Sequence, residues 1–308
     1  MKIDILLATY NGARFLREQI GSLLAQTHRE WRVIARDDGS SDDSPEILDA
    51  YAQAHPERFL IIKDRLRLGA KLSFSALMQH ADAPYVALCD QDDFWRPEKL
   101  SVLLQQMQDA EELAGQDVPV LIHSDLEVVN QEMETISPSF WAYQGIDPVR
   151  NRLGNLLVDN TVTGCTILMN QVLLRLAQPV PEAAYMHDYW LALVAATVGR
   201  IVAVRQPLVR YRQHGSNTLG AVRLRKFFSL PGGTLNPAKL TLSYVPACEQ
   251  AAVLVQALTG RATQQQLEPA ARFARLYEHG ALGRRWLLIQ NGSLPARWRR
   301  RISVLVRV

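Results

Sequence analysis

The sequence has few cysteines and no long apolar run. Its three cysteines, Cys89, Cys165 and Cys248, lie far apart among 308 residues and form no CxxC pair. A disulfide framework is therefore excluded, and a reducing cytoplasm is the expected location. Asp4 interrupts the first apolar run, so we expect no signal peptide. The longest apolar stretch, 190–204, is broken by an arginine and falls short of the about 20 residues that cross a bilayer.

Two phosphate-binding signatures are also missing. The sequence contains neither GxGxxG nor GxxxxGK(S/T), so neither a dinucleotide-binding Rossmann motif nor a P-loop is supported. What is present is an ordinary globular composition, with 48% apolar and 21% charged residues and a formal net charge of +3. A chain of this length can bury a full core as one large domain or two modest ones.

Residues 284–308 are strongly basic. They hold seven arginines and no acidic residue, and tryptophan, leucine, isoleucine and valine are interleaved with the arginines. One interpretation is a solvated basic tail that closes a helical C-terminal region. The other is an amphipathic surface that rests on anionic lipid, because arginine and tryptophan favour the headgroup layer. We expect no nucleic-acid partner, because the rest of the chain carries no nucleic-acid motif.

Strand and helix patterns alternate in the first 122 residues. Short apolar runs ended by turn residues predict strands at 3–8, 31–35, 59–62, 85–89 and 118–122, and helical spacing predicts helices at 14–25, 44–54, 72–80 and 97–113. This βαβα order predicts an α/β fold, with a mostly parallel sheet flanked by helices on both faces. Further along, the sequence predicts a loop-rich stretch at 130–160, strands at 161–169 and 201–211, a helix at 188–198, and helices beyond about residue 223.

Polar residues follow three of these strands directly. Thr9, Tyr10 and Asn11 follow the first strand, Asp38 follows the second, and residues 90–93 follow the fourth. Ligands of parallel α/β sheets bind outside the carboxyl ends of the strands. We therefore expect the three loops to meet at one edge of the sheet.

The acidic run DQDD at 90–93 is a candidate cation site. In an extended or turning segment, residues i and i+2 point the same way, so Asp90 and Asp92 can face one point in space. Two carboxylates there suit Mg²⁺ or Mn²⁺, with phosphates filling the remaining positions. The alternative is a solvated acidic turn, in which Asp93 caps the helix that begins near Pro97.

Three further polar groups are candidates for binding or catalysis. Tyr10 offers an aromatic face beside Asp38, which can accept hydrogen bonds from a ribose or a pyrimidine ring. The pair His187-Asp188 precedes an apolar helix whose dipole favours the ionised carboxylate, although such a pair is more often structural. His214 is either a polar loop residue or a metal ligand through its neutral imidazole.

Seven segments, taken in order, resemble the family-2 glycosyltransferases, which have the GT-A nucleotide-diphospho-sugar transferase fold. The segments are ILLATYNG (5–12), RDDGSSDD (36–43), LGAKLSF (68–74), DQDDFWRPEKL (90–100), TGCTILMN (163–170), HDYW (187–190) and YRQHGSN (211–217). Together they cover most of residues 1–217. The combination of DQDD, HDYW and YRQHG is similar to the bacterial rhamnosyltransferase-like branch, which builds cell-surface polysaccharide. This chain departs from related sequences near Arg67 and Ser73, where an asparagine is usual.

The resemblance implies a set of donor-binding residues. Tyr10 would lie against the nucleobase, Asp38 would bond its ring nitrogen, and Asp90 would bind the ribose. The other implied donor-binding residues are Thr9, Asn11, Lys71 and Arg212, the last as a phosphate contact.

The resemblance also implies a metal site, a base and an acceptor side. Asp92 and His214 would hold Mg²⁺ or Mn²⁺ on the diphosphate, and Asp188 would deprotonate the acceptor hydroxyl. The implied acceptor-side residues are Asp93, Trp95, His187 and Trp190.

The expected activity is an inverting, metal-dependent transfer of a sugar to a hydroxyl of a cell-surface polysaccharide or lipid-linked glycan. The donor would be dTDP-rhamnose or another UDP- or dTDP-sugar. The expected division is a GT-A domain at 1–222, with a nucleotide-sugar part at 1–100 and an acceptor part at 101–222, and a helical basic region at 223–308. The basic tail would make peripheral contact with the inner face of the plasma membrane.

Two other functions share this scaffold. A non-catalytic nucleotide-sugar or glycan-binding module would tolerate loss of the acidic residues, yet Asp90, Asp92 and Asp188 are all present. A nucleotidyltransferase would need a glycine-rich, basic loop after the first strand, and the Tyr-Asn-Gly-Ala-Arg loop fits that role poorly.

Overall fold

The computed structural model describes residues 1–64, 66–215, 244–295, 301 and 304–305. Its strands are β1 (Ile3–Thr9), β2 (Trp31–Asp37), β3 (Phe59–Ile62), β4 (Tyr85–Cys89), β5 (Phe94–Trp95), β6 (Val120–Val129), β7 (Thr135–Ser137), β8 (Leu168–Asn170) and β9 (Arg200–Arg212). Its helices are α1 (Ala13–Leu24), α2 (Ser44–Ala54), α3 (Gly69–Met78), α4 (Lys99–Ala114), α5 (Phe140–Gln144), α6 (Leu153–Leu156), α7 (Gln171–Ala177), α8 (His187–Val198), α9 (Val245–Leu258), α10 (Gln264–Ala274) and α11 (Ala281–Gln290).

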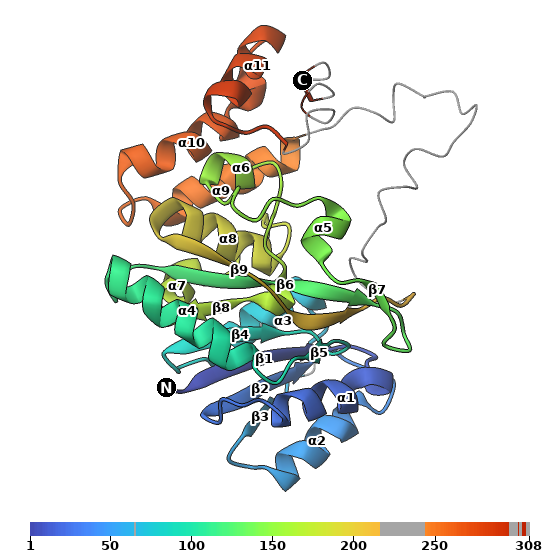
Figure 1. Ribbon diagram of the computed structural model, residues 1–308. Helices are drawn as coiled ribbons and strands as arrows, with labels where there is room; N and C mark the ends of the chain where they lie inside the picture. Colours follow the sequence, from blue (N-terminus) through green and yellow to red (C-terminus); the bar gives the residue numbers. More distant parts are fainter. Residues whose placement is uncertain (65, 216–243, 296–300, 302–303, 306–308) are drawn as a thin grey trace, which may run out of the picture.

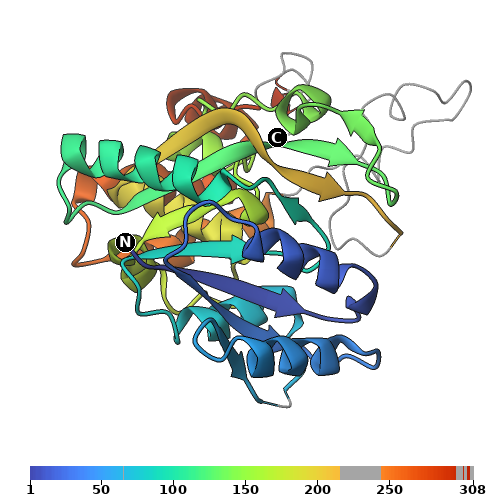
Figure 2. The same cartoon turned by 60° about the horizontal axis from the view of Figure 1, so that its bottom comes forward.

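Over the described ranges the strands form a nine-stranded sheet in the order β3-β2-β1-β4-β8-β6-β9-β5, with β7 paired to β6. The strands β3, β2, β1 and β4 run parallel to one another, and β6 runs parallel to β9. The short β8 lies antiparallel between β4 and β6. Figures 1 and 2 show this twisted sheet passing through the middle of the molecule with helices on both sides. The α/β architecture predicted from the sequence is confirmed.

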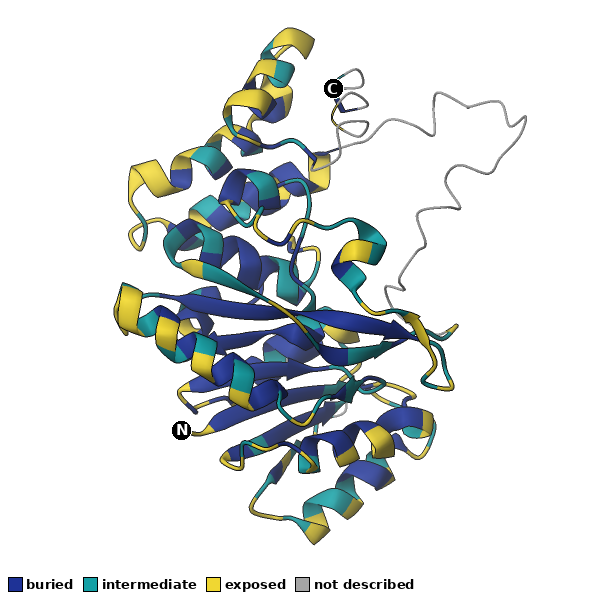
Figure 3. Cartoon of the chain, viewed as in Figure 1, coloured by how far each residue is buried: buried dark blue, intermediate teal, exposed yellow. Residues whose placement is uncertain are grey.

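Two hydrophobic layers hold the helices on the sheet. On one face, Ile5 and Leu7 of β1 share a buried cluster with α1, α2 and α4. On the other face, Leu6 shares a cluster with α3, α7, α8 and the C-terminal helices. This alternation follows from the two-residue period of a strand. Figure 3 shows the central strands β1, β4 and β6 buried between the two layers, whereas β9 is partly exposed.

The middle of the chain differs most from the prediction. Residues 161–169 were expected to form one strand, but a 3₁₀ turn at Gly164–Thr166 comes first and β8 is only three residues long. A Cβ at Gly164 would lie 3.4 Å from the His187 imidazole, so the turn brings the chain closely past the start of α8. The strand predicted at 118–122 runs to Val129, because β9 pairs along most of its length. The loop-rich stretch contains β7, α5 and α6.

The C-terminal helices dock on the middle of the chain. Gly154 of α6 makes this possible, because a Cβ there would lie 1.8 Å from the carbonyl oxygen of Asn291. The Asn155 amide beside it donates a hydrogen bond of 2.7 Å to the carbonyl of Gly292. The helices predicted beyond residue 223 are confirmed for α9 to α11, whereas the expected boundary at 222–223 lies outside the described residues. None of the helices that the structure describes is both long and apolar enough to cross a bilayer.

Candidate active site

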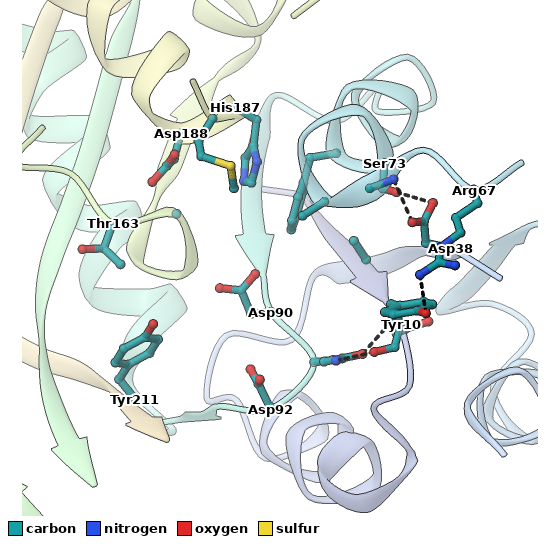
Figure 4. A pocket seen from close by; sticks show the side chains of 18 residues that line it. Tyr10, Asp38, Arg67, Ser73, Asp90, Asp92, Thr163, His187, Asp188 and Tyr211 are labelled. Atoms are coloured by element: carbon teal, nitrogen blue, oxygen red, sulfur yellow. Dashed lines mark hydrogen bonds between the residues drawn. The ribbon is translucent and has the colours of Figure 1, made fainter. Parts of the chain in front are cut away.

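The carboxyl ends of β1, β2 and β4 border a cavity of about 350 Å³. Figure 4 shows two sides of it, with Asp90 and Asp92 between them. We call one side the Tyr10 wall; it consists of Ala8, Thr9, Tyr10, Asp38, Arg67, Gly69, Ala70, Ser73 and Phe74. We call the other side the Asp188 wall; it consists of Thr163, Gly164, Met186, His187, Asp188 and Tyr211. The prediction that three strand-end loops meet at one edge is confirmed.

Tyr10 presents an aromatic surface to the cavity. Its side chain is 39% exposed, which is high for an aromatic residue. The Arg67 guanidinium lies 4.6 Å from the centre of the Tyr10 ring and also donates a hydrogen bond to the Tyr10 hydroxyl. A planar cation over an aromatic ring makes a flat surface suited to a second planar group.

Four hydrogen bonds fix the orientation of the Asp38 carboxylate. Its carboxylate accepts bonds from the backbone amides of Leu68 (2.6 Å) and Gly69 (2.8 Å), from the Ser73 hydroxyl (2.9 Å) and from the buried Arg36 guanidinium (2.7 Å). Burial alone would raise the pKa of Asp38, but these bonds together lower it. Asp38 is therefore an ionised acceptor in a fixed orientation.

Hydrogen bonds join the loops after β1 and β2. The Thr9 hydroxyl donates to Asp37 at 2.8 Å, and the Asn11 side chain accepts from the backbone amide of Ser41 at 2.8 Å. Thr9 lines the cavity, whereas Asn11 does not. The Asn11 side chain holds the second loop in place, and its role in donor binding stays a prediction.

Asp90 and Asp92 both line the cavity, as the DQDD motif predicted. Burial, followed by the negative charges of Asp92 and Asp188, raises the pKa of Asp90. A cation bound between these carboxylates would offset the repulsion between their negative charges.

The donor set at Asp92 fits a divalent cation. The His214 Nε2 atom lies 2.7 Å from Asp92 Oδ2, and both side chains are nearly buried. Neighbouring ligands of an octahedral ion with bonds of 2.0–2.1 Å lie about 3 Å apart. The two atoms are therefore close enough to share one ion, and Asp90 faces the same space (Figure 4).

A second cluster behind this site fits a cation less well. Atoms of Asp90, Asp93 and Cys165 lie within 4.8 Å of one another. However, burial raises the pKa of the Cys165 thiol well above its usual value, and metal binding needs the thiolate. The buried Lys99 amine also donates to the Cys165 carbonyl at 2.6 Å, and burial lowers the pKa of Lys99 to about 7.

Asp188 lies in the first turn of α8 and faces Asp90 across the cavity (Figure 4). Burial raises its pKa to about 6, partly offset by hydrogen bonds from the backbone amides of Tyr189 and Gly164. A carboxylate with this pKa is ionised at neutral pH and a stronger base than an exposed aspartate. His187 beside it stacks on Phe74 with ring centres 4.0 Å apart, and burial lowers its pKa to about 3, so it is neutral.

Two predicted donor-binding residues are directed away from the cavity. The Lys71 ammonium group donates hydrogen bonds to the backbone carbonyls of Glu182 and Ala184. Arg212 is 3% exposed and forms an ion pair with Glu18, and its Nε donates to the Asp92 carbonyl at 3.0 Å. Lys71 therefore secures the loop before α8, and Arg212 secures the backbone of the DQDD loop. Neither lines the cavity, and their roles in donor binding stay predictions.

Three predicted acceptor-side residues lie in the core. Trp95 is fully buried beneath Lys99, and Trp190 is 1% exposed with its indole nitrogen bonded to the Ala177 carbonyl. Asp93 is also fully buried and accepts from the backbone amide of Arg212 at 3.2 Å, so it neither faces an acceptor nor caps α4. These three residues pack in the core or support a loop, and their acceptor-side roles stay predictions. Of the predicted acceptor-side set, His187 alone lines the cavity.

Several cavity residues were not singled out from the sequence as site residues. They are Ala8, Arg67, Gly69, Ala70, Ser73, Phe74, Gln91, Thr163, Gly164, Met186 and Tyr211. Gln91 had a usable signal, because it stands between two predicted site residues. Thr163 and Tyr211 had a weaker signal, because each is the first residue of a matched segment.

The family follows from a profile comparison. Residues 4–175, more than half of the chain, match the family described as glycosyl transferase family 2. The chain belongs to glycosyltransferase family 2. An uncharacterized glycosyltransferase of Nostoc sp. is 26% identical over 224 residues, which are 70% of this chain and 66% of that protein. The chain spans 59–66% of the length of the first curated relatives that it matches.

Solved structures of two other proteins have the same fold. Staphylococcus aureus TarS 1-349 in complex with UDP has a TM-score of 0.58 at 14% identity, over 92% of this chain and 73% of that one. The mannosyltransferase PcManGT of Pyrobaculum calidifontis, in complex with GDP-Man and Mn²⁺, has a TM-score of 0.53 at 18% identity, over 94% and 85% of the two chains. At these identities the likeness establishes the GT-A fold alone.

Proposed function

We propose that this family-2 protein is an inverting, divalent-metal-dependent glycosyltransferase that uses a nucleotide-diphospho-sugar. The observation that carries the proposal is the arrangement of one cavity. An aromatic residue and a fixed carboxylate, Tyr10 and Asp38, lie on one side, and a carboxylate of raised pKa, Asp188, lies on the other (Figure 4). Asp90 and Asp92 lie between them, where the diphosphate of such a donor would extend.

The Tyr10 wall would bind the nucleoside. Tyr10 would stack against the base, and Asp38 Oδ2 would accept a hydrogen bond from its ring N–H. That oxygen accepts only the Gly69 amide among the described residues, whereas Oδ1 accepts three bonds. A carboxylate oxygen has two lone pairs, so one more donor can be accommodated.

Asp92 and His214 would hold Mg²⁺ or Mn²⁺, and Asp90 would bind the ribose. The bound cation would supply Lewis-acid stabilisation of the charge that develops on the leaving diphosphate. Oxygen ligands favour both ions, and the PcManGT complex contains Mn²⁺.

Asp188 would accept the proton of the acceptor hydroxyl as that oxygen bonds to the anomeric carbon. The bond from this carbon to the diphosphate oxygen breaks on the opposite side, and the nucleoside diphosphate leaves with the electron pair. One displacement with no covalent enzyme intermediate inverts the anomeric configuration. General-base assistance of this kind is typically worth about 10²–10⁴-fold in rate.

The proposed donor is dTDP-rhamnose or another UDP- or dTDP-sugar, and the proposed acceptor is a hydroxyl of a cell-surface polysaccharide or lipid-linked glycan. A panel of nucleotide-sugars tests this, with release of nucleoside diphosphate measured in Mn²⁺, in Mg²⁺ and in EDTA. We expect cation-dependent turnover of a pyrimidine nucleotide-sugar. Metal-dependent binding of a donor without hydrolysis or transfer to any glycan would favour the non-catalytic module instead.

The exposed face of α11 supports peripheral contact with anionic membranes. Leu282, Trp286 and Ile289 lie four and three residues apart, on one side of the helix, and are 79%, 63% and 55% exposed. Arg284 and Arg285 flank them, and α11 lies at the end of the molecule opposite α2 (Figure 1). Most of the basic tail predicted to share this role lies outside the described residues.

Vesicle co-sedimentation tests this contact. We expect binding to phosphatidylglycerol vesicles that weakens with salt, is weak on phosphatidylcholine, and is lost in the Trp286→Ser/Ile289→Ser variant. The matched control is Leu113→Ser, because Leu113 is an equally exposed leucine (78%) on α4. Equal sedimentation of wild type and the double variant would contradict the proposal.

A further inference from the structure

We propose that Gln91 is a positioning residue that fixes Tyr10 relative to Asp90 and Asp92. This inference rests on the proposed function, in which Tyr10 contacts the nucleobase and the two aspartates serve the ribose and the metal. Gln91 stands between those aspartates in the sequence and lines the same cavity. Sequence comparison alone gives it no role.

The Gln91 side chain joins two loops that are 81 residues apart. Its Oε1 accepts a hydrogen bond from the backbone amide of Tyr10 at 2.7 Å, and its Nε2 donates to the Tyr10 carbonyl at 2.9 Å. A carboxamide carries a donor and an acceptor side by side, so it can satisfy both backbone groups of one residue. The loop after β1 is thereby fastened to the loop after β4.

Gly12 leaves the space that this contact needs. Its backbone angles, φ −109° and ψ 5°, do not themselves require glycine. A Cβ at this position, however, would lie 2.1 Å from Gln91 Oε1 and 2.3 Å from its Cδ. The absence of a side chain at residue 12 is therefore explained by the Gln91 amide and not by backbone strain.

The hydrogen bonds from Gln91 fix the backbone that carries the exposed Tyr10 ring. Tyr10 is 39% exposed, and Arg67, whose guanidinium lies against its ring, is itself an exposed residue. The backbone of Tyr10 therefore sets where the ring lies, and Gln91 holds that backbone. A misplacement of about 1 Å can cost on the order of 10²-fold in a reaction that depends on alignment.

Two substitutions break the contact from opposite sides. Gln91→Met keeps the length of the side chain and removes both hydrogen bonds. Gly12→Ala leaves Gln91 intact and displaces its amide. The matched controls are Gln53→Met, at an exposed glutamine on α2, and Gly21→Ala, where a Cβ would meet nothing within 4 Å in α1. Thermal unfolding of every variant verifies that the fold is retained.

The readout is calorimetric binding of UDP, dTDP and GDP in the presence of Mn²⁺. We expect Gln91→Met and Gly12→Ala each to weaken binding of the preferred nucleotide by roughly ten- to a hundredfold, the range seen for groups that orient ligand-binding residues. Both controls should bind as wild type does. In a Tyr10→Ala background, Gln91→Met should have almost no further effect, because the ring that it positions is gone.

Three results would overturn the inference, and they are distinguishable. Wild-type affinity in Gln91→Met would show that the contact positions nothing of consequence. An equal loss in the Tyr10→Ala background would show that Gln91 contacts the donor itself. Failure of the wild-type protein to bind any of the three nucleotides with Mn²⁺ or Mg²⁺ would instead overturn the proposed function, and the inference with it.

Discussion

On the Tyr10 wall, Asp38 accepts hydrogen bonds from two backbone amides, a hydroxyl and a guanidinium, and its pKa is lowered. On the Asp188 wall, the pKa of Asp188 is raised to about 6 by burial, and the amides that contact it offset only part of that effect. The first carboxylate is fixed by four hydrogen bonds, and in the proposed function its Oδ2 atom accepts one more from the ligand. The second has spare basicity and can accept a proton. In the proposed function, the Tyr10 wall therefore binds the donor and the Asp188 wall supplies the base.

The largest expected effect comes from removing the base. Asp188→Asn keeps the size of the side chain but cannot accept the acceptor proton, so we expect transfer to fall by about 10²–10⁴-fold. Initial rates with saturating donor and acceptor measure the loss. The control is Asp117→Asn, an exposed residue after α4 that should retain full activity. A near-normal rate in Asp188→Asn would assign the proton transfer to another group.

Loss of the Asp38 carboxylate from the Tyr10 wall should lower the stability of the protein. Asp38→Asn leaves the fully buried Arg36 with Asp64 as its remaining ionic partner, so we expect unfolding free energy to fall by about 3 kcal/mol. Urea unfolding measures this loss. A change of less than about 0.5 kcal/mol, the usual range for surface sites, would mean that Asp38 is not needed to hold the wall together.

Loss of the Asp188 carboxylate from the Asp188 wall should instead raise the stability of the protein at neutral pH. Because the folded pKa of about 6 lies above the usual value of 3.8, folding favours the protonated form. Stability contributed by this group is therefore present below pH 4 and lost as pH rises through about 6. We expect the unfolding free energy of Asp188→Asn to exceed that of wild type by about 3 kcal/mol at pH 7.5 and to be nearly the same at pH 4. A pH-independent difference between the two proteins would contradict the raised pKa.

The smallest expected effect compares one hydroxyl from each wall. The buried Ser73 hydroxyl donates to Asp38 and accepts from Arg36, so Ser73→Ala should cost about 1 kcal/mol of unfolding free energy. The Thr163 hydroxyl has no hydrogen-bond partner in the part of the chain that the structure describes, so Thr163→Ala should change stability by less than about 0.5 kcal/mol. Equal losses of unfolding free energy in Ser73→Ala and Thr163→Ala would contradict the claim that the Tyr10 wall is the more tightly hydrogen-bonded of the two.

The position of the site could be predicted because parallel strands end at one edge. The apolar runs before Thr9, Asp38 and Asp90 located those ends, and the α/β order required them to meet. The roles came from the resemblance to known transferases. What sequence could not give was the direction of long side chains. Lys71, Arg212 and Trp95 lie in matched segments, yet contacts with distant parts of the chain hold them in positions that do not line the cavity.

The turn before β8 was missed for a related reason. The segment at 161–169 is apolar enough for a strand, but its path is set by close contact of Gly164 with α8, which no local pattern reveals. Gln91 was overlooked because its partner, the Tyr10 backbone, is 81 residues away.

Donor binding by Asp188→Asn tests the division between the two walls most directly. Calorimetric titration with UDP or dTDP in Mn²⁺ should give the wild-type affinity for this variant, although its transfer is lost. Loss of nucleotide binding together with transfer would contradict the account, because it would place Asp188 in the binding machinery that we assign to the opposite wall.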